Sequence, residues 1–564
     1  MKKIISVLLS VIMIFSLVPV AATAADAELI ITVANDLHYN HQAATAPAKV
    51  TEDYAHVASA GQLRYENEII IDTFLKEAAS NESSVVLLPG DIVDRGTADE
   101  YTVMAAKLSA FEKSSGKSVY VVPGNHEIQY SKTPSVEFMN TFAEFGYNEA
   151  IAKDTNSASY VVDLPGGYRL LAIDSTKAGD GANGMTEERA AWIEEQAAKA
   201  QNDGKKTIAM MHHNLIEHLI LGNTLHSGSV ISKSFGLQEV FTKYNVKYNF
   251  VGHTHEHDIA SYTGENGNTF YSVVTGSLNA APSPYRVVTF GDDVKIETRH
   301  INSIDMTALK GVISDNCYNL ATTDFAEYSD KCFSVGFDII LDQYLSASRL
   351  IKLLGLDETD DAEMCEVIER IAPVIKDAVY MPIYTYDEQI SGKSLQRIAE
   401  NFDMDFPESD YKTFAELALS LYAAHVKGDE NYGILSTEFV LLTGVVTAFL
   451  GYILKDVSAE DYGRVLNFIC SKINIDAPVD FCTYAANEIT KIEGIEILLS
   501  AGLSGVLLQF STDEGPKDNN ITLPGIAAGT EKEEEPKEMT FFEKIMSFFR
   551  NFFDAILRFF GVGK

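Results

Sequence analysis

The sequence predicts an α/β domain followed by an all-α domain and a C-terminal amphipathic helix. Between residues 29 and 301, short runs rich in β-branched residues alternate with helical stretches. From residue 302 to about 508, apolar residues recur at spacings of three and four, which is typical of helices. A polar stretch and a Phe-rich segment then end the chain. These changes along 564 residues indicate several domains.

The α/β domain is expected over residues 25–301. Its first strands are predicted, in chain order, at ELIITVAND, SVVLLPGD, SVYVVPGNHE, SYVVDL, YRLLAID, KTIAMMHH and YNFVGHTH. Helices are predicted between them over Asn67–Ser80, Asp99–Ser114 and Thr186–Asn202. Several of these strands end directly in polar clusters, which places the chemistry at the carboxyl ends of the strands. The runs TFYSVVTGS, YRVVTF and DVKIETRHI are expected to close the domain as antiparallel strands.

The all-α domain is expected over residues 302–510. Its helices are predicted over Ser346–Leu356, Ala362–Asp377, Lys412–Lys427, Val440–Lys455 and Ala459–Ile475. All five cysteines of the chain lie after residue 300. For the pairs Cys317–Cys332 and Cys470–Cys482 the sequence leaves open whether they form disulfides or stay buried free thiols.

The C-terminal part begins with an acidic and polar linker, expected over residues 511–538. Residues 539–564 are predicted to form a Phe-rich amphipathic helix, on which the polar residues would share one sector. So wide an apolar face behind a linker favours contact with a membrane surface or with a partner. The alternative is that this helix folds back onto its own chain.

Charge and targeting signals restrict the location and the partners. The chain carries 44 Lys and Arg against 80 Asp and Glu, a formal charge of −36, which argues against nucleic-acid binding. Residues 1–24 have the basic start, the apolar stretch and the small-residue cleavage site of a signal peptide. We therefore expect a secreted or cell-surface protein.

Five short motifs in chain order carry the chemistry. They are Asp36-Leu37-His38, Gly90-Asp91-Ile92-Val93-Asp94-Arg95-Gly96, Gly124-Asn125-His126-Glu127, His212-His213 and Gly252-His253-Thr254-His255. Each follows a predicted strand. Carboxylate, imidazole and amide ligands suit Fe, Mn or Zn better than Ca, which prefers oxygen ligands alone. Seven candidate ligands are too many for one ion, and two ions that share a carboxylate fit the number.

In this order the five motifs resemble those of the calcineurin-like metallophosphoesterase superfamily. The resemblance covers about residues 29–300. It implies a four-layer α/β/β/α sandwich with two metal ions, of which Fe, Mn or Zn are expected, at the carboxyl ends of the strands. The resemblance implies one metal held by Asp36, His38, Asp91 and His255. It implies a second held by Asp91, Asn125, His212 and His253, with Asp91 bridging the two.

The resemblance also implies roles for three further residues. His126 matches the general acid that protonates the leaving alkoxide, Asp94 would orient it, and Arg95 would grip phosphate. In many members Pro follows the histidine doublet, whereas here Asn214 follows. His213 therefore stays an alternative to His212 as the ligand, and His212 is preferred.

The function implied is hydrolysis of phosphomonoesters or phosphodiesters by a metal-bridging hydroxide, in an exported enzyme. The identity of the substrate is left open, and nucleotides are among the candidates. The alternative is a surface-associated binding protein in which the helical domain and the Phe-rich tail carry the function. A further alternative within the enzyme reading is that the helical domain caps the active site and sets its specificity.

Overall fold

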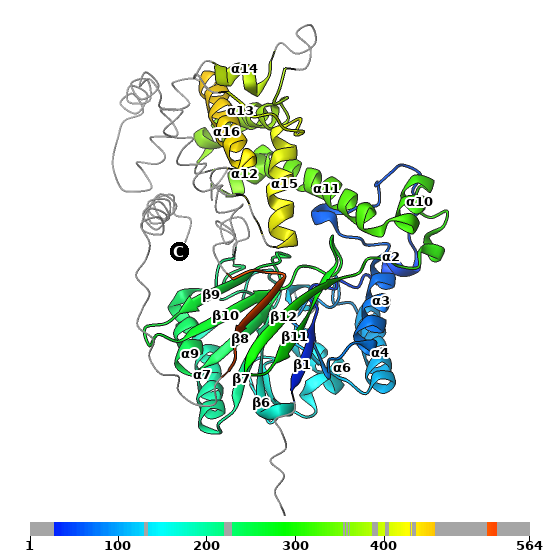
Figure 1. Cartoon of the computed structure of the whole chain (residues 1–564), viewed down its shortest axis with the longest axis vertical. Helices are drawn as coiled ribbons and strands as arrows, with labels where there is room; N and C mark the ends of the chain where they lie inside the picture. The colour runs from blue at the N-terminus through cyan, green and yellow to red at the C-terminus, as the bar shows by residue number, and fades with distance from the viewer. Residues whose placement is uncertain are drawn as a thin grey trace, which may run out of the picture.

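The structure is a computed structural model of the chain, shown in Figure 1. It describes residues 28–128, 134–218, 228–353, 356, 359, 361–385, 393–400, 405–428, 430, 432, 436–456 and 516–526. The predicted signal peptide, the helix expected over Ala459–Ile475 and the Phe-rich helix lie outside the described residues, so all three stay predictions. None of the helices in the described part is long and apolar enough to cross a membrane.

Two β-sheets build the α/β part of the molecule. The first has six strands, in the order β13 (Asn520–Pro524), β12 (Asp293–His300), β11 (Pro284–Phe290), β1 (Leu29–Val33), β2 (Val85–Leu88) and β3 (Ser118–Val121). Strands β1, β2 and β3 are parallel, whereas β1, β11, β12 and β13 pair antiparallel. Because β1, β2 and β3 run the same way, the loops that follow them emerge at one edge.

The second sheet has seven strands. Their order is β4 (Ala152–Lys153), β5 (Tyr160–Leu164), β6 (Tyr168–Ile173), β7 (Lys206–Met211), β8 (Val246–Val251), β10 (Thr269–Val274) and β9 (Ile259–Thr263). Strands β6, β7, β8 and β10 are parallel. The run TFYSVVTGS contains β10, which was expected to be antiparallel. That expectation is wrong for its pairing with β8, which is parallel. The antiparallel partner of β10 is β9, which the sequence analysis missed.

The two sheets share one apolar core, and helices pack outside them. The largest cluster of buried residues combines Leu170 and Phe250 of the second sheet with Val287 and Phe290 of the first. Helices α3 (Asn67–Ser80), α4 (Ala98–Ser115) and α6 (Pro134–Thr141) lie beside the first sheet, and α7 (Glu187–Asn202) and α9 (Leu237–Lys243) beside the second (Figure 1). The predicted helices of this part are thus found within one residue of their expected bounds.

The helical region is inserted between two neighbouring strands of the first sheet. Its described helices are α10 (Asp315–Thr323), α11 (Phe325–Tyr344), α12 (Ala347–Leu353), α13 (Ala362–Val379), α14 (Leu395–Ala399), α15 (Phe414–Lys427) and α16 (Thr437–Asp456). Figure 1 shows most of them above the ends of the sheets, with α10 to the side above α3. Within this region Cys317 and Cys332 are buried free thiols, so the disulfide considered for this pair is not formed.

The segment predicted to be a linker over residues 511–538 contains β13, which corrects that prediction. The short run Ile521-Thr522-Leu523 pairs antiparallel with β12 and places Leu523 in the core. Just before it, the buried Asp518 carboxylate accepts a hydrogen bond from the backbone N–H of Ile259 at 2.8 Å. The chain therefore returns from the helical region to the sheet. The strand was not predicted because residues 511–538 as a whole are polar and charged.

Helix α11 lies against the α/β part at van der Waals distance. A Cβ added at Gly336 would come within 2.0 Å of the backbone N of Gly61, in the short helical turn Ser59–Gly61. Gly336 permits this approach because it has no side chain. The contact fixes one face of the helical region over the loop that follows the first motif.

A buried ionic cluster joins α15 to the second sheet. His425 of α15 hydrogen-bonds through Nδ1 to Glu430, and its Nε2 lies 3.9 Å from the Glu256 carboxylate. Burial lowers the pKa of His425, but the hydrogen bond to Glu430 and the charges of Glu256 and Asp258 outweigh it and raise the pKa to about 9. Protonated His425 therefore stabilises the fold fully below about pH 6.5, its pKa in an unfolded chain, and this stabilisation is lost as the pH rises through about 9.

We expect the His425→Gln variant to lose about 2–3 kcal/mol more free energy of unfolding at pH 6 than at pH 9.5. Urea unfolding of both proteins at the two pH values measures this difference. In a Glu430→Gln background the pH-dependent part should fall by more than half, because the main hydrogen-bond partner is already gone. An equal loss at both pH values would contradict the ionic pairing.

Candidate metal centre

The five motifs meet at the carboxyl ends of five strands drawn from both sheets. Asp36 and His38 follow β1, Asp91 follows β2, and Asn125 follows β3. From the second sheet, His212 follows β7, and His253 and His255 follow β8. The seven expected ligands thus come from segments far apart in the chain, and their side chains gather in two adjoining clusters.

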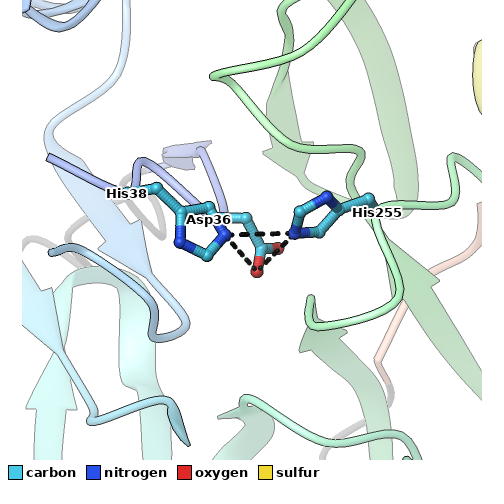
Figure 2. Close-up of side chains that lie close together, drawn as sticks. All are labelled: Asp36, His38 and His255. Carbon is cyan, nitrogen blue, oxygen red and sulfur yellow. Dashed lines mark hydrogen bonds and ion pairs between the residues drawn. The ribbon is translucent and has the colours of Figure 1, made fainter. Parts of the chain in front are cut away.

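The first cluster contains Asp36, His38 and His255, whose potential ligand atoms all lie within 4.8 Å of one another. The two imidazole Nε2 atoms are 3.1 Å apart, and the Nε2 atom of His255 lies 3.5 Å from Asp36 Oδ1. Figure 2 shows a nitrogen atom of each ring turned toward the other ring, beside the Asp36 carboxylate. Two nitrogens and a carboxylate oxygen that converge in this way form a suitable metal site.

The second cluster contains Asp91, His212, His253 and Asn125. His212 Nε2 lies 3.3 Å from Asp91 Oδ2 and 3.0 Å from Asn125 Oδ1. His253 Nδ1 lies 2.9 Å from the same Asn125 oxygen. A carboxylate, an amide oxygen and two imidazoles therefore surround one point.

Asp91 lies between the two clusters. Its Oδ2 atom is 3.3 Å from His212 Nε2 and 3.8 Å from His38 Nε2, and the residue is 2% exposed. Its Oδ1 atom accepts a hydrogen bond from the backbone N–H of His126 at 2.9 Å. Gly124 makes room for this carboxylate, because a Cβ there would come within 2.2 Å of Asp91 Oδ1. One oxygen of Asp91 is thus held by the backbone, while the other faces both clusters.

The backbone is in the left-handed region at five of the expected ligands, with φ of 52° at Asp36, 47° at His38, 48° at Asp91, 73° at His253 and 61° at His255. For residues with a Cβ this conformation costs energy, and it persists only where the surrounding structure imposes it. Part of the favourable free energy of folding therefore offsets this backbone strain, which directs the five side chains into the clusters.

The protonation of the histidines separates two that stay neutral from one that is charged. Burial holds the pKa values of His38 and His253 well below their usual range, and the charge of His126 lowers that of His38 further, as the charge of His212 does for His253. Burial also acts on His212, but Asp91 outweighs it and raises the pKa of His212 to about 9. A cation at this position would displace that proton, because a ligating imidazole must be neutral.

The structure distinguishes the two members of the histidine doublet. His212 Nδ1 lies 3.0 Å from the carbonyl of Pro89, so an N–H there leaves Nε2 free to face the second cluster. The ring of His213 instead contacts Ser175 Oγ at 2.9 Å and the carbonyl of Gly181 at 3.3 Å. Burial and the charge of His212 lower the pKa of His213 to about 3, so it is neutral. Of the two rings, that of His212 faces the second cluster.

His126 lies at the edge of the first cluster. Its Nδ1 atom hydrogen-bonds to the carbonyl of Asp94 at 2.6 Å and lies 3.7 Å from the Asp94 carboxylate. The other oxygen of that carboxylate accepts a hydrogen bond from Asn40 Nδ2 at 2.6 Å. The His126 side chain is 28% exposed and lines the cavity described below. Asp94 therefore holds the ring mainly through its backbone, and Asn40, which the sequence analysis missed, holds Asp94.

Glu127 is a second residue that the sequence analysis did not assign. Its buried carboxylate accepts hydrogen bonds from the backbone N–H groups of Asp91, Val93 and Gly124 at 2.7–2.9 Å. It therefore ties the loops of the second and third motifs together. The available signal was the fourth letter of the motif Gly124-Asn125-His126-Glu127, where a carboxylate follows the ligand by two positions.

Arg95 is not brought into the site. Its side chain is 57% exposed, its Nε lies 3.9 Å from Asp94, and it does not line the cavity at the two clusters. The phosphate contact expected for Arg95 therefore lacks support in this arrangement.

A cavity of about 200 Å³ opens over both clusters. Its polar side comprises His38, Gln62, Asp91, Asn125, His126, His253, Thr254 and His255. Its other side comes from Ala280 and from helices α11 and α15 of the inserted region. The helical region therefore forms part of the wall of the candidate site.

The donor set fits the metals expected from the sequence. Mixed imidazole nitrogens and carboxylate oxygens suit Fe, Mn or Zn, and an ion at either cluster would find at least three donors. The buried Nδ1 atom of His38 has no hydrogen-bond partner among the described residues and lies 4.0 Å from the Asp94 carboxylate, while its Nε2 atom faces the first cluster.

Residues 29–257 match the family model of the calcineurin-like phosphoesterases, which confirms the resemblance seen in the five motifs. A probable glycerophosphodiester phosphodiesterase GpdQ from Arcobacter nitrofigilis is 28% identical over 179 residues, which are 30% of this chain and 59% of that protein. A glycerophosphodiester phosphodiesterase GpdQ from Enterobacter lignolyticus is 28% identical over 178 residues, which are 31% of this chain and 58% of that protein. The chain thus spans less than two thirds of either relative. A dimetal phosphatase from Danio rerio aligns with a TM-score of 0.34 and 11% identity, over 48% of this chain and 96% of that one.

Proposed function

We propose that this chain, whose residues 29–257 form a calcineurin-like phosphoesterase region, is an exported metal-dependent hydrolase of phosphoric esters. The observation that carries the proposal is the position of Asp91, whose Oδ2 atom faces both clusters at once. Such a shared carboxylate is what a site for two adjacent ions requires. Export rests on the predicted signal peptide, and recovery of a mature protein that begins near Ala25 outside the cell would test it.

The proposed catalytic domain comprises residues 25–301 together with β13. Helices outside both sheets support the four-layer sandwich that the resemblance implies. We assign one ion to Asp36, His38, Asp91 and His255, and the other to Asp91, Asn125, His212 and His253. When bound, two such ions would lower the pKa of a water molecule and offset the negative charge of the phosphate.

The proposed work of the chain's own residues is to position the ester and to move a proton. His126 Nε2 would donate a proton to the oxygen of the departing alcohol, because Nδ1 is occupied by the Asp94 carbonyl. Asn40 and Asp94 would keep the ring in place. Both curated relatives are named glycerophosphodiester phosphodiesterases, which favours a diester over a monoester as substrate.

The test combines a metal determination with two assays on one sample of the protein. We expect roughly two ions of Fe, Mn or Zn per chain, as a two-metal site requires, and turnover of bis-p-nitrophenyl phosphate above that of p-nitrophenyl phosphate. A chelator should abolish both activities, and each of the three metals should be tried for recovery. A protein that holds neither metal nor activity after all three are supplied would support the alternative of a binding protein.

A further inference from the structure

We propose that the inserted helical region sets the specificity of the site, and that it selects esters whose phosphate carries a small apolar or aromatic group. This inference rests on the proposed function, because it names the substrate class of the same site. Its observation is the juxtaposition of the two metal-ligand clusters with an apolar wall supplied by α11 and α15.

The wall has a defined composition. Four residues of the inserted region line the cavity opposite the ligand clusters, namely Phe333, Ile340, Tyr422 and Val426. Phe333 and Val426 are 6% and 4% exposed, whereas Ile340 and Tyr422 are half-buried. Apart from the hydroxyl of Tyr422, these side chains offer dispersion contacts and no hydrogen-bonding group.

The wall is anchored on the α/β part, so it is not a loosely placed surface. Phe333 stacks on Tyr422 with ring centroids 5.8 Å apart and planes at 15°. Phe333 and Val426 also pack with Ala281 of the α/β part in one buried cluster. The close approach of Gly336 to Gly61 fixes the next turn of α11. A rigid wall can discriminate between substrates, because it cannot move aside for a poorly fitting group.

Charge excludes a second class of substrate. Among the described residues that line the cavity, none is Lys or Arg. Each further phosphate of a nucleoside diphosphate or triphosphate would therefore enter the cavity without a Lys or Arg side chain among these residues to meet it. Burial of an unpaired charge is costly, so such substrates are disfavoured.

The size of the cavity limits the apolar group. A cavity of about 150 Å³ holds one benzene molecule. The cavity here has about 200 Å³. Since the phosphate must occupy part of this volume, at most one ring or one short alkyl group fits beside it.

The test uses two anions that cannot be hydrolysed as esters, phenylphosphonate and methylphosphonate, with the metal-loaded full chain in a calorimeter. We expect phenylphosphonate to bind at least about tenfold more tightly, because its ring would be buried against the wall. In the Ile340→Asn variant this ratio should fall to about threefold or less, since a polar group replaces part of the wall. The matched control is Ile339→Asn, a half-buried neighbour on α11 that does not line the cavity and should keep the ratio.

Each outcome of this test decides a different statement. Equal binding of the two phosphonates, or an equal fall in both variants, overturns the apolar wall. If Ile340→Asn does not fold, Val426→Thr, which keeps the side-chain shape, must lower the ratio instead. If the ratio behaves as expected but no phosphate ester is turned over, the wall stands and the proposed hydrolase function falls. If esters are turned over while the ratio is near one, only this inference falls.

Discussion

The Asp91→Asn variant is expected to lose bound metal and activity together. The substitution removes a carboxylate that faces both clusters, at 3.3 Å from His212 Nε2 and 3.8 Å from His38 Nε2. We expect the metal content to fall to one ion or none per chain, and kcat/KM to fall by about 10³-fold or more, since metal ions contribute several kcal/mol to such reactions. Elemental analysis and hydrolysis of bis-p-nitrophenyl phosphate, measured on one sample, provide both readouts.

Asn is the appropriate replacement because it should preserve the fold. It tolerates the φ of 48° at this position, and its Oδ1 atom can still accept the hydrogen bond from the backbone of His126. The matched control is Asp99→Asn, an exposed residue in the first turn of α4, which should keep both ions and full activity. A fully metallated and active Asp91→Asn protein would refute the bridging role.

The His126→Ala variant is expected to lose turnover while its metal content stays unchanged. His126 is not one of the seven expected ligands, but its ring lines the cavity beside them. Loss of a general acid costs about 10²–10⁴-fold in rate. This cost should appear with an ethyl ester, whose alkoxide needs a proton to leave, and should be much smaller with a p-nitrophenyl ester.

The dependence on the leaving group separates proton donation from a structural role. A variant that only distorts the site would slow both esters alike and would also reduce the metal content. His41→Ala is the control, because His41 also carries an imidazole but does not line the cavity. Full activity of His126→Ala on the ethyl ester would show that another group supplies the proton.

Local sequence patterns predicted most of the α/β part because its elements are set by local preferences. Helix α3 runs over Asn67–Ser80, as expected, and α4 begins at a capping box formed by Thr97 and Glu100. Strands β9 and β13 escaped prediction because they lie in polar stretches and most of their residues are not buried, so they lack a clear apolar signal. Their positions depend on pairing with distant strands.

For the candidate site, the sequence alone supplied the residue types and their order. Asp36, His38, Asp91 and the other expected ligands each follow a strand. An apolar run that ends in a polar cluster can be recognised from the sequence alone. The supporting residues were harder to identify. Asn40 and Glu127 hold Asp94 and the motif loops through hydrogen bonds to groups between 3 and 54 positions away.

By itself the sequence determined that this chain has phosphoesterase-like motifs with candidate metal ligands on an α/β framework, followed by helices. Only the tertiary structure decided that His212 rather than His213 faces the ligand cluster, and that Arg95 stays outside the cavity. It also decided that Phe333 and Tyr422, more than 200 positions after Asp91, form the opposite wall of the site. The reason is physical: residue types and periodicity are local properties, whereas the direction of a side chain and the neighbour it meets depend on how distant segments pack.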